Sequence, residues 1–96
     1  MTVRWHPAAA AEADAAAGYY RDQRSDLARR FLNSLDEALD RISLNPLIYR
    51  EVEPGVRKCK LQTFPYALIF RDQDPEIEIV AVMHVRREPG YWKARL

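Results

Sequence analysis

The sequence contains few of the residues that stabilise very small domains or bind metal ions. A single cysteine, Cys59, cannot form an internal disulfide, which argues against a disulfide-stabilised secreted domain. The two histidines, His6 and His84, lie far apart in the chain, so we expect neither a metal site nor a cofactor. The longest unbroken apolar run, residues 79–83, is much shorter than the roughly 20 residues of a membrane helix. We therefore expect one cytoplasmic domain over residues 1–96, with no membrane partner.

The net charge is also small, because 15 Lys and Arg residues face 14 Asp and Glu residues. Residues 1–45 carry six basic and seven acidic side chains, whereas residues 46–96 carry nine basic and seven acidic ones. Within the second half, residues 55–71 and residues 84–96 are locally basic. A total of +1 gives little long-range attraction to a nucleic acid, so any binding through charge must come from these two segments.

The first half of the chain has the periodicity of two helices. Residues 8–23 are rich in alanine, with Glu12 and Asp14 in the early turns, which favours a helix. Residues 27–44 carry apolar side chains at steps of three and four: Leu27, Phe31, Leu35, Leu39 and Ile42. Asn45-Pro46 ends this pattern. The short connection between the two segments predicts an antiparallel helical hairpin.

After Pro54-Gly55 the apolar period changes from 3.6 to 2. We predict strands over residues 56–63, 66–71 and 77–85, which form a three-strand antiparallel meander. A short strand at residues 3–5 precedes the hairpin, and residues after Gly90 can add one helical turn. The predicted class is therefore α+β, with the hairpin packed on one face of the sheet. Cys59 and Leu61 share one face of the first meander strand, which predicts a buried, inert thiol.

The second half also carries a family likeness. It combines Phe64-Pro65-Tyr66, the apolar strand at residues 77–83 and the ending HVRREPGYWKAR at residues 84–95. With the order of the elements, these residues resemble the RelE/ParE superfamily of bacterial toxins, and most closely its ParE-like, plasmid-stabilisation branch. The resemblance implies the toxin of a type II toxin–antitoxin pair, neutralised by a small antitoxin whose C-terminal segment wraps around the toxin.

The resemblance implies two alternative activities, and the fold alone does not separate them. RelE-like members cut messenger RNA on the ribosome, which requires a base, an acid and cations around the phosphate. The residues here that match this plan are Lys58, Lys60, His84, Arg86, Arg87 and Tyr91. Lys58 and Lys60 lie two apart on a strand and therefore face the same way. His84 has a structural alternative, because it shares a predicted face with Val80 and Val82 and can hydrogen-bond a neighbouring loop.

One difference from the RelE-like pattern favours the ParE-like activity. RelE-like nucleases carry an arginine directly after the aromatic residue that opens the second meander strand, and this sequence has Ala67 there. We therefore predict a ParE-like toxin that arrests growth through a protein target such as DNA gyrase, without catalysis. The residues expected to contact the target are Arg87, Tyr91, Trp92 and Arg95, with packing against the sheet as the alternative role of Trp92. A ribosome-dependent endoribonuclease remains the alternative, and a member that binds its antitoxin without arresting growth is a third possibility.

Overall fold

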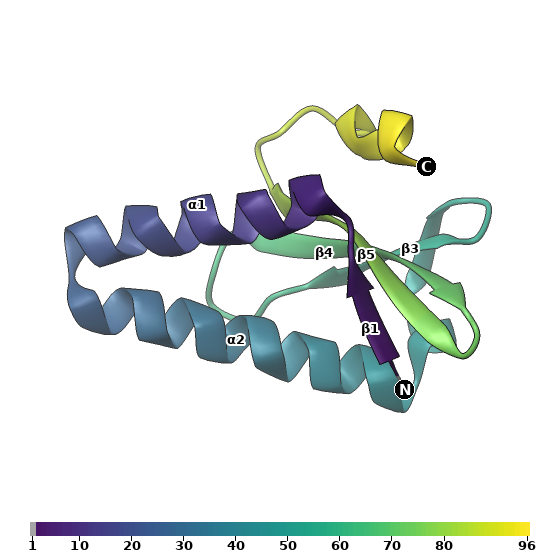
Figure 1. The fold of residues 1–96 in the computed structure, drawn as a ribbon, viewed down its shortest axis with the longest axis horizontal. Coiled ribbons are helices and arrows are strands. Elements are labelled where there is room, and N and C mark those ends of the chain that lie inside the picture. Colours follow the sequence, from purple (N-terminus) through teal and green to yellow (C-terminus); the bar gives the residue numbers. More distant parts are fainter. Residues whose placement is uncertain (1) are drawn as a thin grey trace.

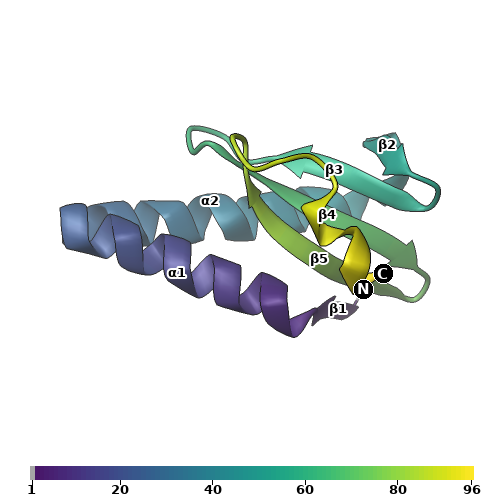
Figure 2. The same cartoon turned by 90° about the horizontal axis from the view of Figure 1, so that it is seen from above.

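The computed structural model describes residues 2–96, and its sheet separates two helical layers. The elements follow in the order β1 (Thr2–Trp5), α1 (Pro7–Gln23), α2 (Ser25–Leu44), the short 3-10 helix η1 (Pro46–Ile48), β2 (Arg50–Glu53), β3 (Val56–Lys60), β4 (Tyr66–Gln73), β5 (Glu76–His84) and the 3-10 helix η2 (Tyr91–Arg95). The hairpin of α1 and α2 covers one face of the sheet, and η2 lies on the other (Figures 1 and 2). We call these the hairpin face and the tail face. The predicted α+β fold is confirmed.

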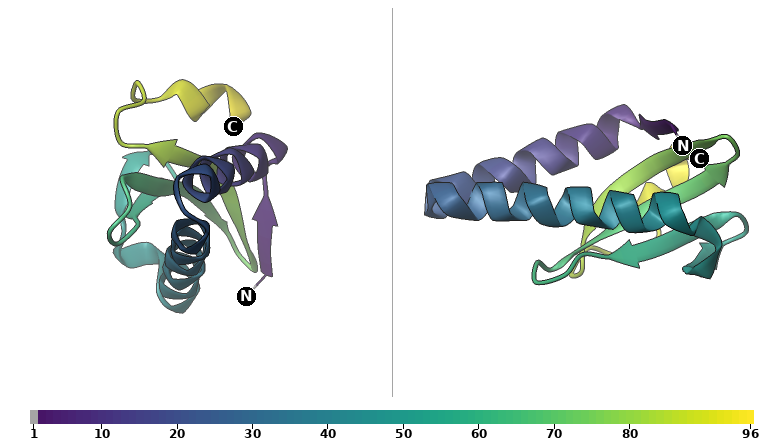
Figure 3. Two further views of the ribbon diagram at one scale, coloured as in Figure 1. Left: turned by 90° about the vertical axis from the view of Figure 1, so that its left-hand side faces the viewer. Right: turned by 90° about the horizontal axis from the view of Figure 1, so that it is seen from below.

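The two helices meet the sheet with different side chains. Helix α1 contributes small residues, and its Ala9, Ala13, Ala16 and Ala17 are all buried. Helix α2 contributes the predicted apolar stripe, in which Phe31 and Ile42 are almost completely buried. Small side chains allow α1 to approach the sheet closely, while larger ones fill the space beneath α2. Figure 3 shows the resulting pair of antiparallel helices beside the sheet.

The sheet contains one strand that the sequence pattern did not predict. Its order is β1-β5-β4-β3-β2, so four antiparallel strands, not three, follow the hairpin, and β1 pairs in parallel with β5. Strand β2 has the sequence Arg-Glu-Val-Glu, which lacks the alternation used to find strands. Its Glu51 lies opposite Arg57 of β3, an opposite-charge pair that suits an exposed edge strand. Strand β3 also ends earlier than predicted, at Lys60.

Strand β5 contains a bulge at Val80. Two consecutive residues of β4 pair with Ala81 and Ile79, which leaves Val80 as an extra residue. As a result Val80 and Ala81 both pack on the tail face, whereas Val82 and His84 lie on the hairpin face. The prediction that His84 shares a face with Val80 is therefore wrong, because the bulge inverts the alternation between them.

Each face of the sheet has its own apolar cluster. On the hairpin face, Phe31 packs edge-on against Phe64 and Tyr66, with ring centroids 5.5 and 5.4 Å away. Cys59 and Leu61 are buried in the same cluster, as predicted, and burial raises the pKa of the Cys59 thiol. On the tail face, Trp92 of η2 covers the sheet. No helix within residues 2–96 is both long enough and apolar enough to cross a membrane.

A substitution at Phe31 measures how much the hairpin-face cluster contributes to stability. Replacing the fully buried Phe31 with alanine should lower the free energy of unfolding by about 3–5 kcal/mol, because the substitution removes apolar contact and leaves a cavity. Urea denaturation followed by circular dichroism measures this change. Leu32→Ala is the matched control, since Leu32 is the next residue of α2 and is 41% exposed. Equal effects of the two substitutions would contradict the assignment of this core.

Candidate functional site

The C-terminal segment after β5 crosses from the end of the sheet to its tail face. Gly90 lies in the turn before η2 with φ 79°, a left-handed conformation that favours glycine. Trp92 then enters the tail-face cluster and retains only 3% exposure. Lys93 pairs with Glu53 of β2 at 3.0 Å. The predicted helical turn is therefore present, and Trp92 takes the packing role that was the alternative to target contact.

The carboxylate of Glu12 in α1 holds the opposite side of this segment. It accepts hydrogen bonds from the hydroxyl of Tyr91, at 2.7 Å, and from both terminal nitrogens of Arg95, at 2.8 and 3.0 Å. It also accepts one from the backbone N–H of Val82 in β5, at 3.0 Å. Helix η2 therefore lies beside the N-terminal half of α1 (Figures 1 and 3). Four donors from two other elements converge on one side chain.

These contacts lie along the outer edge of β5, beyond the point where its pairing with β1 ends. Strand β1 ends at Trp5, and the N–H of His6 makes one further bond to the carbonyl of Ile79. Beyond that point the carboxylate of Glu12 accepts a hydrogen bond from the N–H of Val82, and the guanidinium of Arg95 donates one to the carbonyl of Val80 at 3.0 Å. A carboxylate and a guanidinium thus take the place of a neighbouring strand for these buried backbone groups.

The protonation of the cluster follows from these contacts. Burial alone would raise the pKa of Glu12, but the hydrogen bonds from Arg95, Tyr91 and Val82 outweigh it and hold that pKa below its ordinary value of 4.5. Burial raises the pKa of Tyr91, and its hydrogen bond to the Glu12 carboxylate raises it further. At neutral pH Glu12 is therefore charged, and Tyr91 remains a neutral donor that is bound to it.

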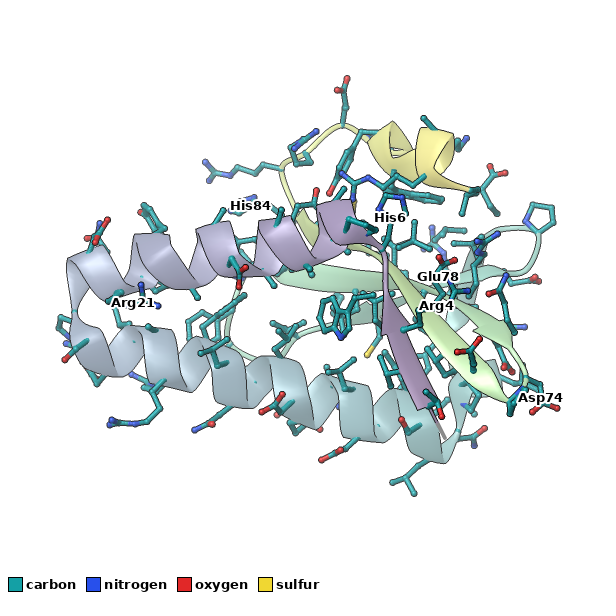
Figure 4. The ribbon with its side chains drawn as sticks, in the orientation of Figure 1. Arg4, His6, Arg21, Asp74, Glu78 and His84 are labelled. Carbon is teal, nitrogen blue, oxygen red and sulfur yellow. The ribbon has the colours of Figure 1, made fainter. Side chains whose placement is uncertain are left out.

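An open pocket of about 310 Å³ lies next to this cluster, between α1 and the ends of β4 and β5. Its aromatic walls are Tyr19, Tyr66 and Tyr91, and its rim carries His84 and Arg87. The guanidinium carbon of Arg87 lies 3.8 Å from the centroid of the Tyr91 ring, a cation–π contact on an exposed side chain. Figure 4 shows His84 beside α1. The structure thus brings together His84, Arg87 and Tyr91, three of the six residues expected for a nuclease site.

The two lysine candidates for a nuclease lie on the other face of the sheet, and Arg86 is exposed in the segment after β5. Lys58 lines a separate groove on the tail face together with Met83 and Trp92, and Lys60 is exposed on the same face. His84 faces the hairpin side, and its Nδ1 accepts a hydrogen bond from the backbone N–H of Arg86 at 3.0 Å. This is the structural role that the sequence left open for the histidine. The lysine pair and the histidine therefore occupy opposite faces of the sheet.

The expected target-contact residues also separate into two kinds. Arg87 and Tyr91 form a stacked pair at the pocket, whereas Arg95 is paired with Glu12 and Trp92 is buried. Glu12 itself was not predicted as a site residue. It was noted only as a helix-favouring acid, and nothing in the sequence separates it from Asp14, which is exposed on the same helix. Within residues 2–96, no group of three or more His, Cys, Asp or Glu side chains could hold a metal ion.

Comparisons with known proteins identify the family. The model of the family described as the ParE toxin of the type II toxin–antitoxin system, parDE, matches residues 3–89. The chain therefore belongs to the ParE toxin family, and the predicted membership of the RelE/ParE superfamily is confirmed. Membership in a toxin–antitoxin family implies a cognate antitoxin as partner.

A solved structure supports the fold. The chain is similar to one from the chromosomal ParDE TA system of P. aeruginosa, with a TM-score of 0.75 and 24% sequence identity. The match covers 88% of this chain and 95% of that one. A comparison with curated proteins finds no match.

The charge on Glu12 should be measurable as a pH-dependent contribution to stability. At pH 7, Glu12→Gln should lower the free energy of unfolding by about 1–3 kcal/mol, because hydrogen bonds to a charged acceptor are replaced by weaker ones. The pKa of Glu12 is lowered in the folded state, so its contribution is complete above the ordinary value of 4.5 and is lost as the pH falls through the folded value. The difference between the wild type and Glu12→Gln should therefore be smaller in acid, well below pH 4.5, than at pH 7.

Urea denaturation at both pH values measures this difference. Asp14→Asn is the matched control, since it makes the same charge change on an exposed residue of the same helix. A difference that persists unchanged at low pH would show that the Glu12 charge does not stabilise the cluster.

Proposed function

We propose that this protein is a toxin that arrests growth in the cytoplasm by inhibiting DNA gyrase, and that its cognate antitoxin neutralises it. Family membership supplies the toxin–antitoxin context. The observation that carries the choice of a protein target is the bonding of the Tyr91 hydroxyl to Glu12, at 2.7 Å. A tyrosine that donates to a buried carboxylate and has a raised pKa is a poor source of a proton for a leaving group.

The distribution of cations supports the same choice. Metal-independent RNA cleavage requires several cations around one phosphate. Here Lys58 and Lys60 belong to the tail face, His84 belongs to the hairpin face, and Arg95 is occupied by Glu12. The small side chain at Ala67 is completely buried and offers no cation at the position where RelE-like enzymes have one. These residues do not converge on a single phosphate-sized site.

The stacked pair of Arg87 and Tyr91 is better suited to a protein surface. Arginine and tyrosine are enriched among the residues that dominate binding energy in protein interfaces. Arg87 and the neighbouring Arg86 are exposed, and neither forms an ion pair within residues 2–96. We therefore assign target contact to Arg86, Arg87 and the accessible part of Tyr91.

We assign the antitoxin to a different surface. Several large apolar side chains of the hairpin and the turn after it are exposed, with relative exposures between 41% and 86%: Leu32, Leu44, Leu47 and Ile48. Leu44, Leu47 and Ile48 follow one another closely at the end of α2 and in η1, and neighbouring exposed apolar groups are typical of surfaces that a partner covers. A wrapping C-terminal segment, as the family resemblance implies, would bury them.

A supercoiling assay tests the gyrase proposal. The purified protein should inhibit supercoiling of relaxed plasmid by bacterial DNA gyrase in the micromolar range, and equimolar antitoxin should remove the inhibition. Arg87→Ala should raise the half-inhibitory concentration about tenfold, since a hot-spot arginine contributes more than 1 kcal/mol. Lys60→Ala is the control, because Lys60 is an exposed cation on the other face. Unimpaired supercoiling by gyrase at these concentrations would refute the proposal.

The same variants distinguish the ribonuclease alternative in cells. If growth arrest acts through gyrase, induction should leave translated transcripts intact, and Lys60→Ala should still arrest growth. Cleavage of transcripts that Lys60→Ala or Tyr91→Phe abolishes would instead establish a ribosome-dependent endoribonuclease. Soluble, folded protein that neither inhibits gyrase nor arrests growth would identify a member that only binds its antitoxin.

A further inference from the structure

We propose that Glu12 is a positioning residue for target recognition, because its carboxylate orients the C-terminal 3-10 helix and so builds the stacked surface of Arg87 and Tyr91. This inference rests on the proposed function, since it assigns Glu12 to the surface that contacts the target. Glu12 is itself half-buried in α1, and it acts through Tyr91.

The Tyr91 ring is oriented by Glu12 and Arg95. Its hydroxyl is fixed by Glu12 at 2.7 Å, and the guanidinium of Arg95 lies 5.1 Å from the ring centroid. Because Arg95 is also bound to Glu12 through both terminal nitrogens, the carboxylate determines the position of the ring and of the cation beside it. The ring then supplies the face on which Arg87 lies, at 3.8 Å.

The other contacts of η2 do not fix the orientation of the Tyr91 ring. Trp92 is buried in the tail-face cluster and holds the helix against the sheet. The Lys93–Glu53 pair is substantially exposed, with side-chain exposures of 56% and 34%, so it constrains little. The segment between β5 and Gly90 is exposed as well. Loss of the Glu12 contacts would therefore leave η2 attached through Trp92 and through the single hydrogen bond from Arg95 to the carbonyl of Val80, with the Tyr91 ring no longer held by its hydroxyl.

The charge of Glu12 also balances the two arginines near the Tyr91 ring. Arg95 and Arg87 lie near the same ring, and only Arg95 has a carboxylate partner in the cluster. With Glu12 neutralised, the two cations repel each other without compensation and the stack loses its fixed geometry. An isosteric neutral residue at position 12 thus disturbs the surface while it preserves the packing of α1.

Hydrogen exchange and gyrase inhibition together test the inference. In Glu12→Gln, the amides of Lys93 and Leu96, which bond within the tail to Gly90 and Lys93, should exchange about tenfold faster, while amides of β4 stay protected. The half-inhibitory concentration against gyrase should rise about tenfold. Asp14→Asn, the charge-matched control on α1, should change neither quantity.

A second control separates positioning from general destabilisation. Val3→Ala shortens a partly buried side chain in β1 on the hairpin side, so it lowers global stability without touching the cluster. If Val3→Ala weakens inhibition as much as Glu12→Gln does at equal loss of melting temperature, the positioning role is overturned. Unchanged tail exchange in Glu12→Gln also overturns it. A wild-type protein that does not inhibit gyrase refutes the proposed function instead, and the exchange rates still decide whether Glu12 positions the tail.

Discussion

The contacts of the Glu12 carboxylate are the constraint that ties the C-terminal 3-10 helix to helix α1 and strand β5. The carboxylate joins the first helix to the last full strand and to the final 3-10 helix, which are 70 to 83 residues away along the chain. Each of these contacts pairs the carboxylate with a partly or fully buried polar group. Because buried polar groups are costly when unpaired, the contacts act together to select one position for the tail.

The need for this carboxylate arises from the strand geometry. Strand β1 is only four residues long and covers β5 as far as Ile79, and the bulge at Val80 follows at once. The backbone groups of Val80 and Val82 then face a helix, which has no free backbone groups along its side. Only side chains can pair with these groups. The Glu12 carboxylate is the acceptor for the N–H of Val82, and the Arg95 guanidinium is the donor for the carbonyl of Val80.

Much of the fold could be predicted from periodicity, and the exceptions have physical causes. Helix α2 was predictable because its apolar stripe recurs with the helical period, and β5 because residues 79–83 form a continuous apolar run. Strand β2 was not predicted because three of its four residues are charged and only Val52 packs against the tail-face cluster, which leaves too short an apolar pattern to detect. The face of His84 was wrong because a single extra residue in a strand reverses every side chain beyond it.

The candidate site was predictable only in its residue types, since the sequence does not say which cations are already paired. The final segment contains four basic residues that look equivalent in the sequence. In the fold, Lys93 pairs with Glu53 and Arg95 with Glu12, which leaves Arg86 and Arg87 exposed, with Arg87 at the pocket. Because two of the four charges are neutralised internally, the local basic character is smaller than it looks in the sequence. A surface with one arginine stacked on an aromatic ring and a second one exposed next to it in the chain is poor for holding a polyanion along its length, and under the proposed function it makes a compact contact with a protein target.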